Sequence, residues 1–165
     1  MDKLQGALRI KIKKGVGLAV RDVKTSDPYI VVKMARWRLK THVIENNVNP
    51  EWNEYLDLTI QDPDLPVQLT VYDQDKFSKD DNMGDSEIDI KPFLEALKAN
   101  KKKLPSGTVL KKLQPSRSNL LADESRITWK RGKIIQDMCL RLKNVECGEV
   151  ELELSWVENP GATSS

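Results

Sequence analysis

The chain has 165 residues, which is typical of one domain, and a hydrophobic content of 39% is enough to fill one core. It carries 27 Lys and Arg residues against 25 Asp and Glu residues, so its formal net charge of +2 gives no overall attraction to nucleic acid or to acidic surfaces. The mean hydropathy of −0.53 and the short apolar runs exclude a spanning helix of about 20 apolar residues. If charge matters here, it must act locally.

Features of processing and metal chemistry are scarce in the sequence. Cys139 and Cys147 accompany a single histidine, His42, which is too few ligands for a zinc site, and we expect both cysteines to be plain thiols. The amino terminus lacks the basic and then apolar run of a secretory signal, and neither end carries a lipidation motif. We therefore expect a reducing intracellular compartment and no lipid anchor.

Strand patterns dominate the chain. Residues 7–13 alternate apolar and cationic side chains, which is the period of a half-buried strand. The same alternation returns at residues 67–72 and 150–156, and weaker strand patterns cover residues 29–34, 37–44, 55–60, 86–90 and 138–145. Eight short strands separated by Gly, Pro, Asn and Asp predict an all-β fold, an eight-stranded antiparallel β-sandwich formed by residues 1–165 as a single domain.

One segment departs from this pattern. Residues 91–133 hold twelve basic residues against three acidic ones, a net charge of +9. Residues 92–98 are typical of a short helix that starts with proline. We interpret the segment as a basic, partly helical insertion between two strands. Connections of this length are usually functional, although a solvated charged loop remains the alternative.

Acidic residues gather in two connections. Seven of the seventeen residues at 73–89 are acidic, and Asp22 and Asp27 bracket the connection between the first two strands. Because the loops at one end of a sandwich converge, these connections could bring five carboxylates into one pocket. A donor set made only of oxygen suits Ca²⁺ better than zinc or copper.

Three other interpretations of the acidic stretch compete with a calcium site of this kind. An EF-hand loop starting at Asp73 fails, because Phe77, Ser78 and Gly84 would stand at its fifth, sixth and twelfth positions. A phosphatase with an aspartyl-phosphate intermediate would need alternating strands and helices, and few helical periods are present. A merely solvated acidic loop stays open.

The chain contains, in this order, Ser26-Asp27-Pro28-Tyr29, Asn49-Pro50-Glu51-Trp52-Asn53-Glu54 and the acidic run at 73–84. In order and spacing these motifs resemble the signature of C2 domains. The resemblance covers residues 4–90 and 138–157, and the strand order resembles the permuted type II arrangement. We expect Tyr29 and Trp52 to pack and to hold the loops. The resemblance implies that Ca²⁺ is bound by the side chains of Asp22, Asp27, Asp73, Asp75 and Asp81 and by the carbonyls of Arg21 and Gln74.

Two surfaces are expected to contact lipid. Phe77, between Lys76 and Lys79, stands at the tip of the acidic loop, where it could enter the headgroup region. The strands at 29–44 carry a second set of cations on what should be one exposed face, and C2 domains often use that face for phosphoinositides. These cations are Lys33, Arg36, Arg38 and Lys40. A solvated strand face is the alternative.

The start at residues 4–9 and the insertion at 91–133 further resemble the plant C2-domain abscisic-acid-related family. This resemblance implies a protein that is not an enzyme. It would bind anionic phospholipid in a calcium-dependent way, recruit abscisic acid receptors of the PYR/PYL/RCAR type to the plasma membrane and so positively regulate abscisic acid signalling. It also implies the alternative function of a GTPase activator for an unconventional P-loop G protein.

The basic insertion is the expected contact for a protein partner, through Lys101, Lys102, Lys103, Lys130 and Arg131. Sequence-specific nucleic-acid binding is not expected, because Phe93 and Trp129 are the only aromatic residues in the insertion that could stack on bases. A nuclear-import role is easier to accept than DNA binding. The expected locations are therefore the periphery of the plasma membrane, the cytoplasm and the nucleus.

Overall fold

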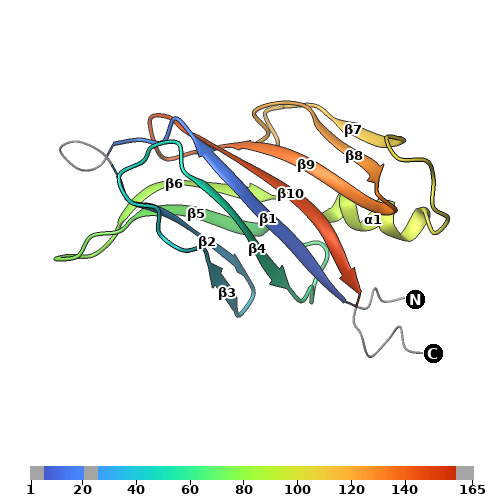
Figure 1. Cartoon of the computed structure of the whole chain (residues 1–165), viewed down its shortest axis with the longest axis horizontal. Helices are drawn as coiled ribbons and strands as arrows, with labels where there is room; N and C mark the ends of the chain where they lie inside the picture. The colour runs from blue at the N-terminus through green and yellow to red at the C-terminus, as the bar shows by residue number, and fades with distance from the viewer. Residues whose placement is uncertain (1–5, 21–25, 159–165) are drawn as a thin grey trace.

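The chain folds into two antiparallel sheets packed face to face, with one helix at one end (Figure 1). The computed structural model describes residues 6–20 and 26–158. The larger sheet has the strand order β4-β1-β10-β9-β8-β7, and the smaller one has the order β3-β2-β5-β6. The elements are β1 (Gly6–Val16), β2 (Pro28–Met34), β3 (Trp37–Lys40), β4 (Glu51–Leu58), β5 (Val67–Asp73), β6 (Asp81–Ile88), α1 (Lys91–Ala99), β7 (Val109–Leu113), β8 (Ser125–Lys130), β9 (Lys133–Arg141) and β10 (Glu149–Glu158).

The alternating sequence pattern determines which face of each strand meets the core. In β1, Leu8, Ile10 and Ile12 are fully buried, while the cationic residues between them face outward. The apolar positions of β10 point into the same core, and β10 pairs with β1 from Gly6 opposite Glu158 onward. The first and last strands are therefore neighbours, in the order expected of a type II arrangement. The predicted antiparallel sandwich is confirmed.

The described residues form ten strands, two more than the eight predicted. The eight expected strands correspond to β1–β6, β9 and β10, and the two others, β7 and β8, lie inside the basic insertion. In β8, Ile127 and Trp129 are buried, and the strand pairs with β9. The insertion therefore extends the larger sheet by two strands.

The helical part of the insertion is present as predicted. Helix α1 begins at Lys91 with Pro92 in its first turn, where a missing N–H group costs nothing. Phe93 and Leu94 are buried, and the helix packs against β9 at the end of the sandwich shown on the right in Figure 1. Among the described residues, no helix is long and apolar enough to cross a membrane.

The two sheets are tied together at the other end. Asp85 of β6 and Lys143 exchange two backbone hydrogen bonds of 3.0 and 2.8 Å. The preceding Gly84 has φ +119°, and a Cβ atom there would lie 2.7 Å from Cγ1 of Val145 and 2.9 Å from Cβ of Leu142. Glycine is therefore required for this close approach, which holds β6 against the connection between β9 and β10.

Candidate calcium and membrane site

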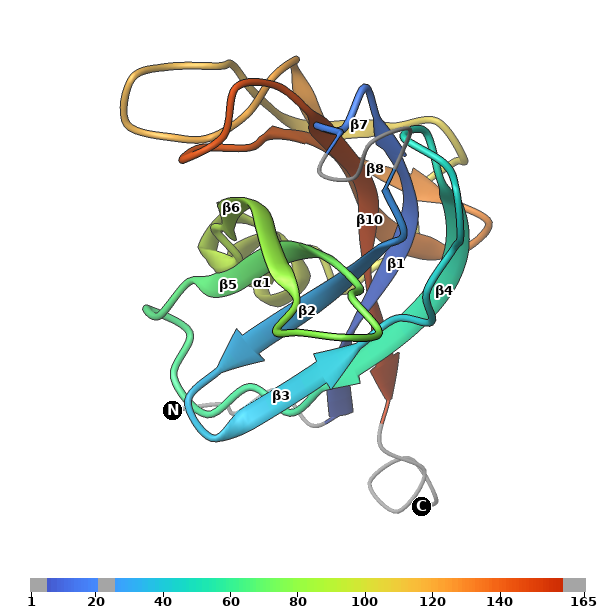
Figure 2. The same cartoon turned by 90° about the vertical axis from the view of Figure 1, so that its left-hand side faces the viewer.

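The register of the smaller sheet brings acidic residues together at one end. Asp73, the last residue of β5, lies opposite both Asp81 of β6 and Pro28 of β2. Asp27 directly precedes Pro28, so Asp27, Asp73 and Asp81 reach the same end of the sheet from three strand ends. Figure 2 looks onto this end, where the connection between β5 and β6 projects. The predicted convergence of the two acidic connections is seen for these residues.

Asp73 and Asp27 form the hydrogen-bonded base of the site. The Asp73 side chain is buried, and its Oδ1 accepts a bond of 2.8 Å from the backbone N–H of Asp27. The N–H of Gln74 donates to the carbonyl oxygen of Asp27 at 3.0 Å, and Oδ1 of Asp27 accepts a bond of 2.8 Å from the N–H of Asn46. These bonds join three connections.

Asp75 organises the loop tip. Its Oδ1 accepts bonds from the N–H groups of Phe77 and Ser78 at 2.8 and 3.2 Å, and its Oδ2 accepts a bond of 2.7 Å from the Ser78 hydroxyl. These donors, the Phe77 N–H most of all, favour the carboxylate and lower the pKa of Asp75. The Phe77 side chain is 97% exposed, and Lys76 and Lys79 beside it are also exposed. The aromatic and cationic tip predicted from the sequence is therefore present.

Tyr29 connects the loop to the sheet. Its ring stacks on that of Tyr72, with 5.6 Å between the ring centroids, and its hydroxyl donates to the carboxylate of Asp80. Oδ1 of Asp80 in turn accepts a bond of 2.9 Å from the N–H of Asp75. Burial, followed by the Asp80 carboxylate, raises the pKa of Tyr29 to about 12. The expectation that Tyr29 packs and holds the loop is confirmed, and Trp52 is buried as expected.

The expected ligands are oxygen donors of the kind that Ca²⁺ prefers, but the described ones are not arranged around a common metal position. Three of the five expected carboxylates, those of Asp27, Asp73 and Asp81, come from adjoining strand ends, and all the expected donors are oxygen atoms, as Ca²⁺ prefers. In the described part of the chain, no group of three His, Cys, Asp or Glu side chains is placed to hold a metal ion. The Asp75 carboxylate faces the amides of its own loop. The expected ligands Arg21 and Asp22 lie outside the described residues.

The expected cationic strand face is only partly assembled. Lys33 of β2 lies opposite Arg38 of β3, and Lys40 lies opposite Val31, so these three cations share the outer face of the smaller sheet. Arg36 lies in the two-residue turn that joins the strands, beside Ala35 at φ 52°, and is not part of the face. Neither strand contains an acidic residue.

The expected partner residues meet at the opposite end of the sandwich. Lys101, Lys102 and Lys103 follow α1, and the Lys103 side chain lies beside Gly132 in the turn between β8 and β9. Arg131 is exposed in the same turn. These cations are expected from the sequence to form one partner contact, and the structure brings the connection at Lys103 beside the turn at Arg131.

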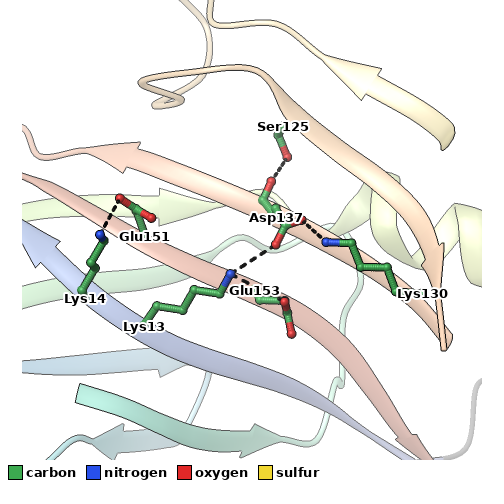
Figure 3. Close-up of polar contacts among 7 residues, drawn as sticks. All are labelled: Lys13, Lys14, Ser125, Lys130, Asp137, Glu151 and Glu153. Atoms are coloured by element: carbon green, nitrogen blue, oxygen red, sulfur yellow. Dashed lines mark hydrogen bonds and ion pairs between the residues drawn. The ribbon is translucent and has the colours of Figure 1, made fainter. Parts of the chain in front are cut away.

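Lys130 belongs to a different network. Its Nζ lies 3.1 Å from Oδ2 of Asp137, whose Oδ1 lies 3.4 Å from Nζ of Lys13, and Lys13 also reaches Glu153 at 3.7 Å (Figure 3). Of these residues, Lys13, Lys130 and Asp137 line a shallow cavity of about 310 Å³ on the outer face of the larger sheet. Lys130 is thus less available to a partner than its sequence neighbours.

The cysteines show no reactive arrangement. Both are free, and they lie on β9 and on the connection that follows it. Burial, with Glu149 nearby, raises the pKa of Cys139 to about 12, which keeps it a thiol at neutral pH. For Cys139 this agrees with the expectation of a plain thiol.

The chain is similar in sequence to proteins of a known family. The model of the C2 domain family matches residues 6–105. Protein C2-DOMAIN ABA-RELATED 5 of Arabidopsis thaliana is 62% identical over 98% of this chain and 80% of its own length. Protein C2-DOMAIN ABA-RELATED 4 of Arabidopsis thaliana is 59% identical over 98% of this chain and 92% of its own length. GTPase activating protein 1 of Oryza sativa subsp. indica is 50% identical over 96% of both chains.

The chain is a C2 domain protein of the C2-domain ABA-related family. Proteins of this family are generally non-catalytic lipid-binding modules. Among solved structures, a C2 domain of plant extended synaptotagmin 1 has a TM-score of 0.60 at 21% identity, covering 96% of this chain and 98% of that one. A calcium-bound structure of two C2 domains of extended synaptotagmin 2 has a TM-score of 0.62 at 22% identity, with this chain covering 48% of it. At these identities the likeness shows the fold alone.

Sequence reasoning missed two roles in this C2 domain. Asp80 is not a predicted ligand, yet it links Tyr29 to the backbone of Asp75. The alternation of apolar and polar residues at 125–130 indicates a strand, but it lies within the basic segment that we interpret from the sequence as an insertion between strands. Asp80 gives no such signal, because its tyrosine partner is 51 positions away.

Proposed function

We propose that this C2 domain protein binds anionic phospholipid in a calcium-dependent way at the plasma membrane. The observation that carries the proposal is the convergence of Asp27, Asp73 and Asp81 at the end of the sheet from which Phe77 projects. The side chains of Asp22, Asp27, Asp73, Asp75 and Asp81, with the carbonyls of Arg21 and Gln74, would hold the ion. When bound, Ca²⁺ supplies positive charge and open coordination positions for lipid phosphate oxygens.

The residues of the chain account for the calcium requirement. Carboxylates without a counter-charge repel an anionic bilayer, so the loop end stays off lipid until they are neutralised. Asp75 is held in its charged form by the donors of its own loop. Phe77 then enters the headgroup region, while Lys76 and Lys79 meet the lipid charge. Lys33, Arg38 and Lys40 supply a second contact, and Arg36 contributes from the turn.

Vesicle co-sedimentation tests this proposal. Wild-type protein is mixed with phosphatidylserine vesicles in calcium or in chelator, beside the variant with Asp75→Ala and Asp81→Ala. At physiological salt we expect strong binding only for the wild type and only in calcium, because the basic surfaces alone bind anionic lipid weakly there. The matched control, Asp62→Ala with Asp64→Ala, removes two exposed aspartates from the connection between β4 and β5 and should bind normally. Equal wild-type binding in chelator would refute the calcium mechanism.

We further propose that the protein recruits abscisic acid receptors to the plasma membrane and so promotes abscisic acid signalling, with additional cytoplasmic and nuclear pools. The names of the relatives, which describe them as ABA-related, support this step. The proposed contact is the basic insertion, through Lys101, Lys102, Lys103 and Arg131, with Lys130 less accessible because of its ion pair.

Because β7 and β8 belong to the larger sheet, deleting the insertion would damage the fold, and substitutions are the better test. Lys101→Gln, Lys102→Gln and Lys103→Gln together should weaken receptor binding in a pull-down without changing vesicle binding through the calcium loops. Receptor binding at the wild-type level would exclude these lysines from the contact.

A second candidate function is activation of a P-loop GTPase. The rice relative that is 50% identical over 96% of both chains is named GTPase activating protein 1, and this similarity favours the candidate. An increase in the GTP hydrolysis rate of a purified P-loop G protein on addition of this chain would support it, and an unchanged rate would remove it.

A further inference from the structure

Two segments that are distant in sequence form one cationic cluster at the α1 end of the sandwich. A Cβ atom on Gly132 would lie 3.6 Å from Nζ of Lys103, so the connection after α1 runs beside the turn between β8 and β9. The N–H of Gly107 donates to the carbonyl of Trp129 at 2.6 Å, and the N–H of Trp129 donates to the carbonyl of Thr108 at 2.9 Å, which attaches this connection to β8. We name as the far-end cluster Lys102, Lys103, Arg131 and Lys133.

No acidic residue in the described part of the chain pairs with this cluster. All four side chains are exposed, and within residues 6–20 and 26–158 none of them forms an ion pair. The neighbouring Lys130 differs from these four residues because it forms an ion pair with Asp137 (Figure 3). The cluster therefore presents four cations to an external anionic group.

The turn holds one of these cations in an uncommon conformation. Lys130 and Lys133 pair across a two-residue turn in which Arg131 has φ 52° and Gly132 has φ 78°. Turns of this kind favour Asn-Gly or Asp-Gly, because both central residues need a positive φ. An arginine in the first position is strained relative to asparagine, which is consistent with a use for its exposed charge.

The far-end cluster lies away from the calcium loops along the strands, as Figure 1 shows. The nine residues of β9 alone span about 30 Å, whereas charges in physiological salt are screened over about 8 Å. If the smaller sheet lies flat on the bilayer instead, Arg131 and Lys133 belong to the other sheet, about 10 Å further out. In both orientations Arg131 and Lys133 lie about 10 Å or more from the bilayer that the calcium loops contact.

Besides the receptor contact proposed above, the composition of the cluster suits lipid headgroups as a ligand. Protein interfaces are depleted in lysine and enriched in aromatic residues, and the nearby aromatic residues Phe93 and Trp129 are buried. Lysine ammonium groups bind phosphates as point charges without a fixed geometry, which suits a fluid headgroup layer. The geometry points to a second lipid contact: we propose that the far-end cluster binds a second anionic bilayer, so that one molecule bridges two membranes. This inference rests on the proposed calcium-dependent binding at the loop end.

The experiment uses a supported phosphatidylserine bilayer covered with the full chain in calcium, to which fluorescent vesicles are then added. The test variant is Lys102→Gln, Lys103→Gln and Arg131→Asn, in which asparagine suits the turn. The control, Lys111→Gln, Lys112→Gln and Arg117→Gln, removes three exposed cations from the same insertion. At about fivefold in affinity per cation, vesicle capture by the test variant should fall at least tenfold, while the control stays near the wild type.

The outcomes separate this inference from the proposed function. We expect capture of phosphatidylserine vesicles but not of phosphatidylcholine vesicles, with a decrease at high salt. Equal capture by the test variant, or equal capture of neutral vesicles, would overturn the bridge. Binding of soluble polyglutamate but not of vesicles would overturn it in favour of an acidic protein partner.

If the wild type fails to coat the bilayer in calcium, the proposed function fails. The variants can then be compared for vesicle binding in chelator at low salt, where equal binding overturns the inference.

Discussion

At the scale of single residues, the loop of the candidate site is held in place by Tyr29 and Asp80, which are not expected calcium ligands. Tyr29 donates to Asp80, and Asp80 accepts the N–H of Asp75, so a side chain of β2 restrains the loop between β5 and β6. A hydrogen bond to a charged group is worth about 1.5–3 kcal/mol when shielded, and less at a partly exposed site such as this one. The loop is therefore partly ordered before any ion binds.

Tyr29→Phe should lower the calcium affinity of vesicle binding a few-fold and the free energy of unfolding by about 1 kcal/mol, because Asp80 loses its donor. Calcium titration of co-sedimentation and urea denaturation would measure the two effects. The control is Tyr55→Phe on the other sheet, where Tyr55 is exposed and its ring lies beneath the cations of Arg9 and Lys11. If both variants behave alike, the Tyr29 hydroxyl has no special role.

Ser78→Ala should raise the pKa of Asp75 toward its ordinary value, since the hydroxyl stabilises the carboxylate. A lowered folded pKa gives stability above the unfolded-state value, and this stability is lost as the pH falls through the folded value. Acid should therefore destabilise the wild type more than the variant. An NMR titration of the Asp75 carboxyl carbon measures the shift, and identical titration curves would contradict it.

At the scale of elements, the contact between β6 and the connection after β9 closes the sandwich near the acidic loops. The backbone bonds of Asp85 with Lys143 depend on the close approach at Gly84. The side chain of Asp85 also accepts bonds from Thr70 and Asn144, at 2.9 and 3.2 Å. The position of β6, and with it that of Asp81, depends on this contact between the sheets.

Gly84→Ala should lower the free energy of unfolding by about 2–3 kcal/mol, because the new Cβ combines steric overlap with strain at a positive φ. Gly107→Ala is the matched control, since its φ is +96° but nothing lies within 4 Å of the added atom. It should cost only the backbone strain of about 1 kcal/mol. Urea denaturation compares them, and equal losses would mean that the contact with Val145 and Leu142 relaxes freely.

At the scale of the whole molecule, a net charge of +2 conceals a separation of charge. Acidic side chains end β5 and begin β6, the outer face of β2 and β3 is cationic, and exposed cations lie at the far end. The free energy of contact with an anionic surface therefore depends on orientation, and salt should weaken it.

Lys33→Gln, Arg38→Gln and Lys40→Gln together should reduce the affinity for phosphatidylserine vesicles in calcium by about 100-fold at low salt, from about 1 kcal/mol per cation. The calcium requirement should persist, because the acidic end is unchanged. Lys111→Gln, Lys112→Gln and Arg117→Gln give the same net charge and should bind like the wild type. A similar loss in both variants would mean that net charge, and not the strand face, controls binding.

The sequence by itself determined the sandwich, the acidic end and the exposed loop tip. Alternation with period two separates Leu8, Ile10 and Ile12 from their cationic neighbours, and local motifs mark Asp73, Asp75 and Phe77. Both the strand pattern and these motifs depend only on residues that are close in sequence.

Pairing between residues that are distant in sequence cannot be inferred in this way. The tertiary structure alone decided that β7 and β8 extend the sheet and that Asp80 holds Tyr29. It also decided that Asp137 neutralises Lys130, while Lys103 lies against the turn at Arg131 and Gly132. The physical reason is that charge and hydrogen bonding depend on which partner the fold brings within about 3 Å, and sequence distance does not encode that partner.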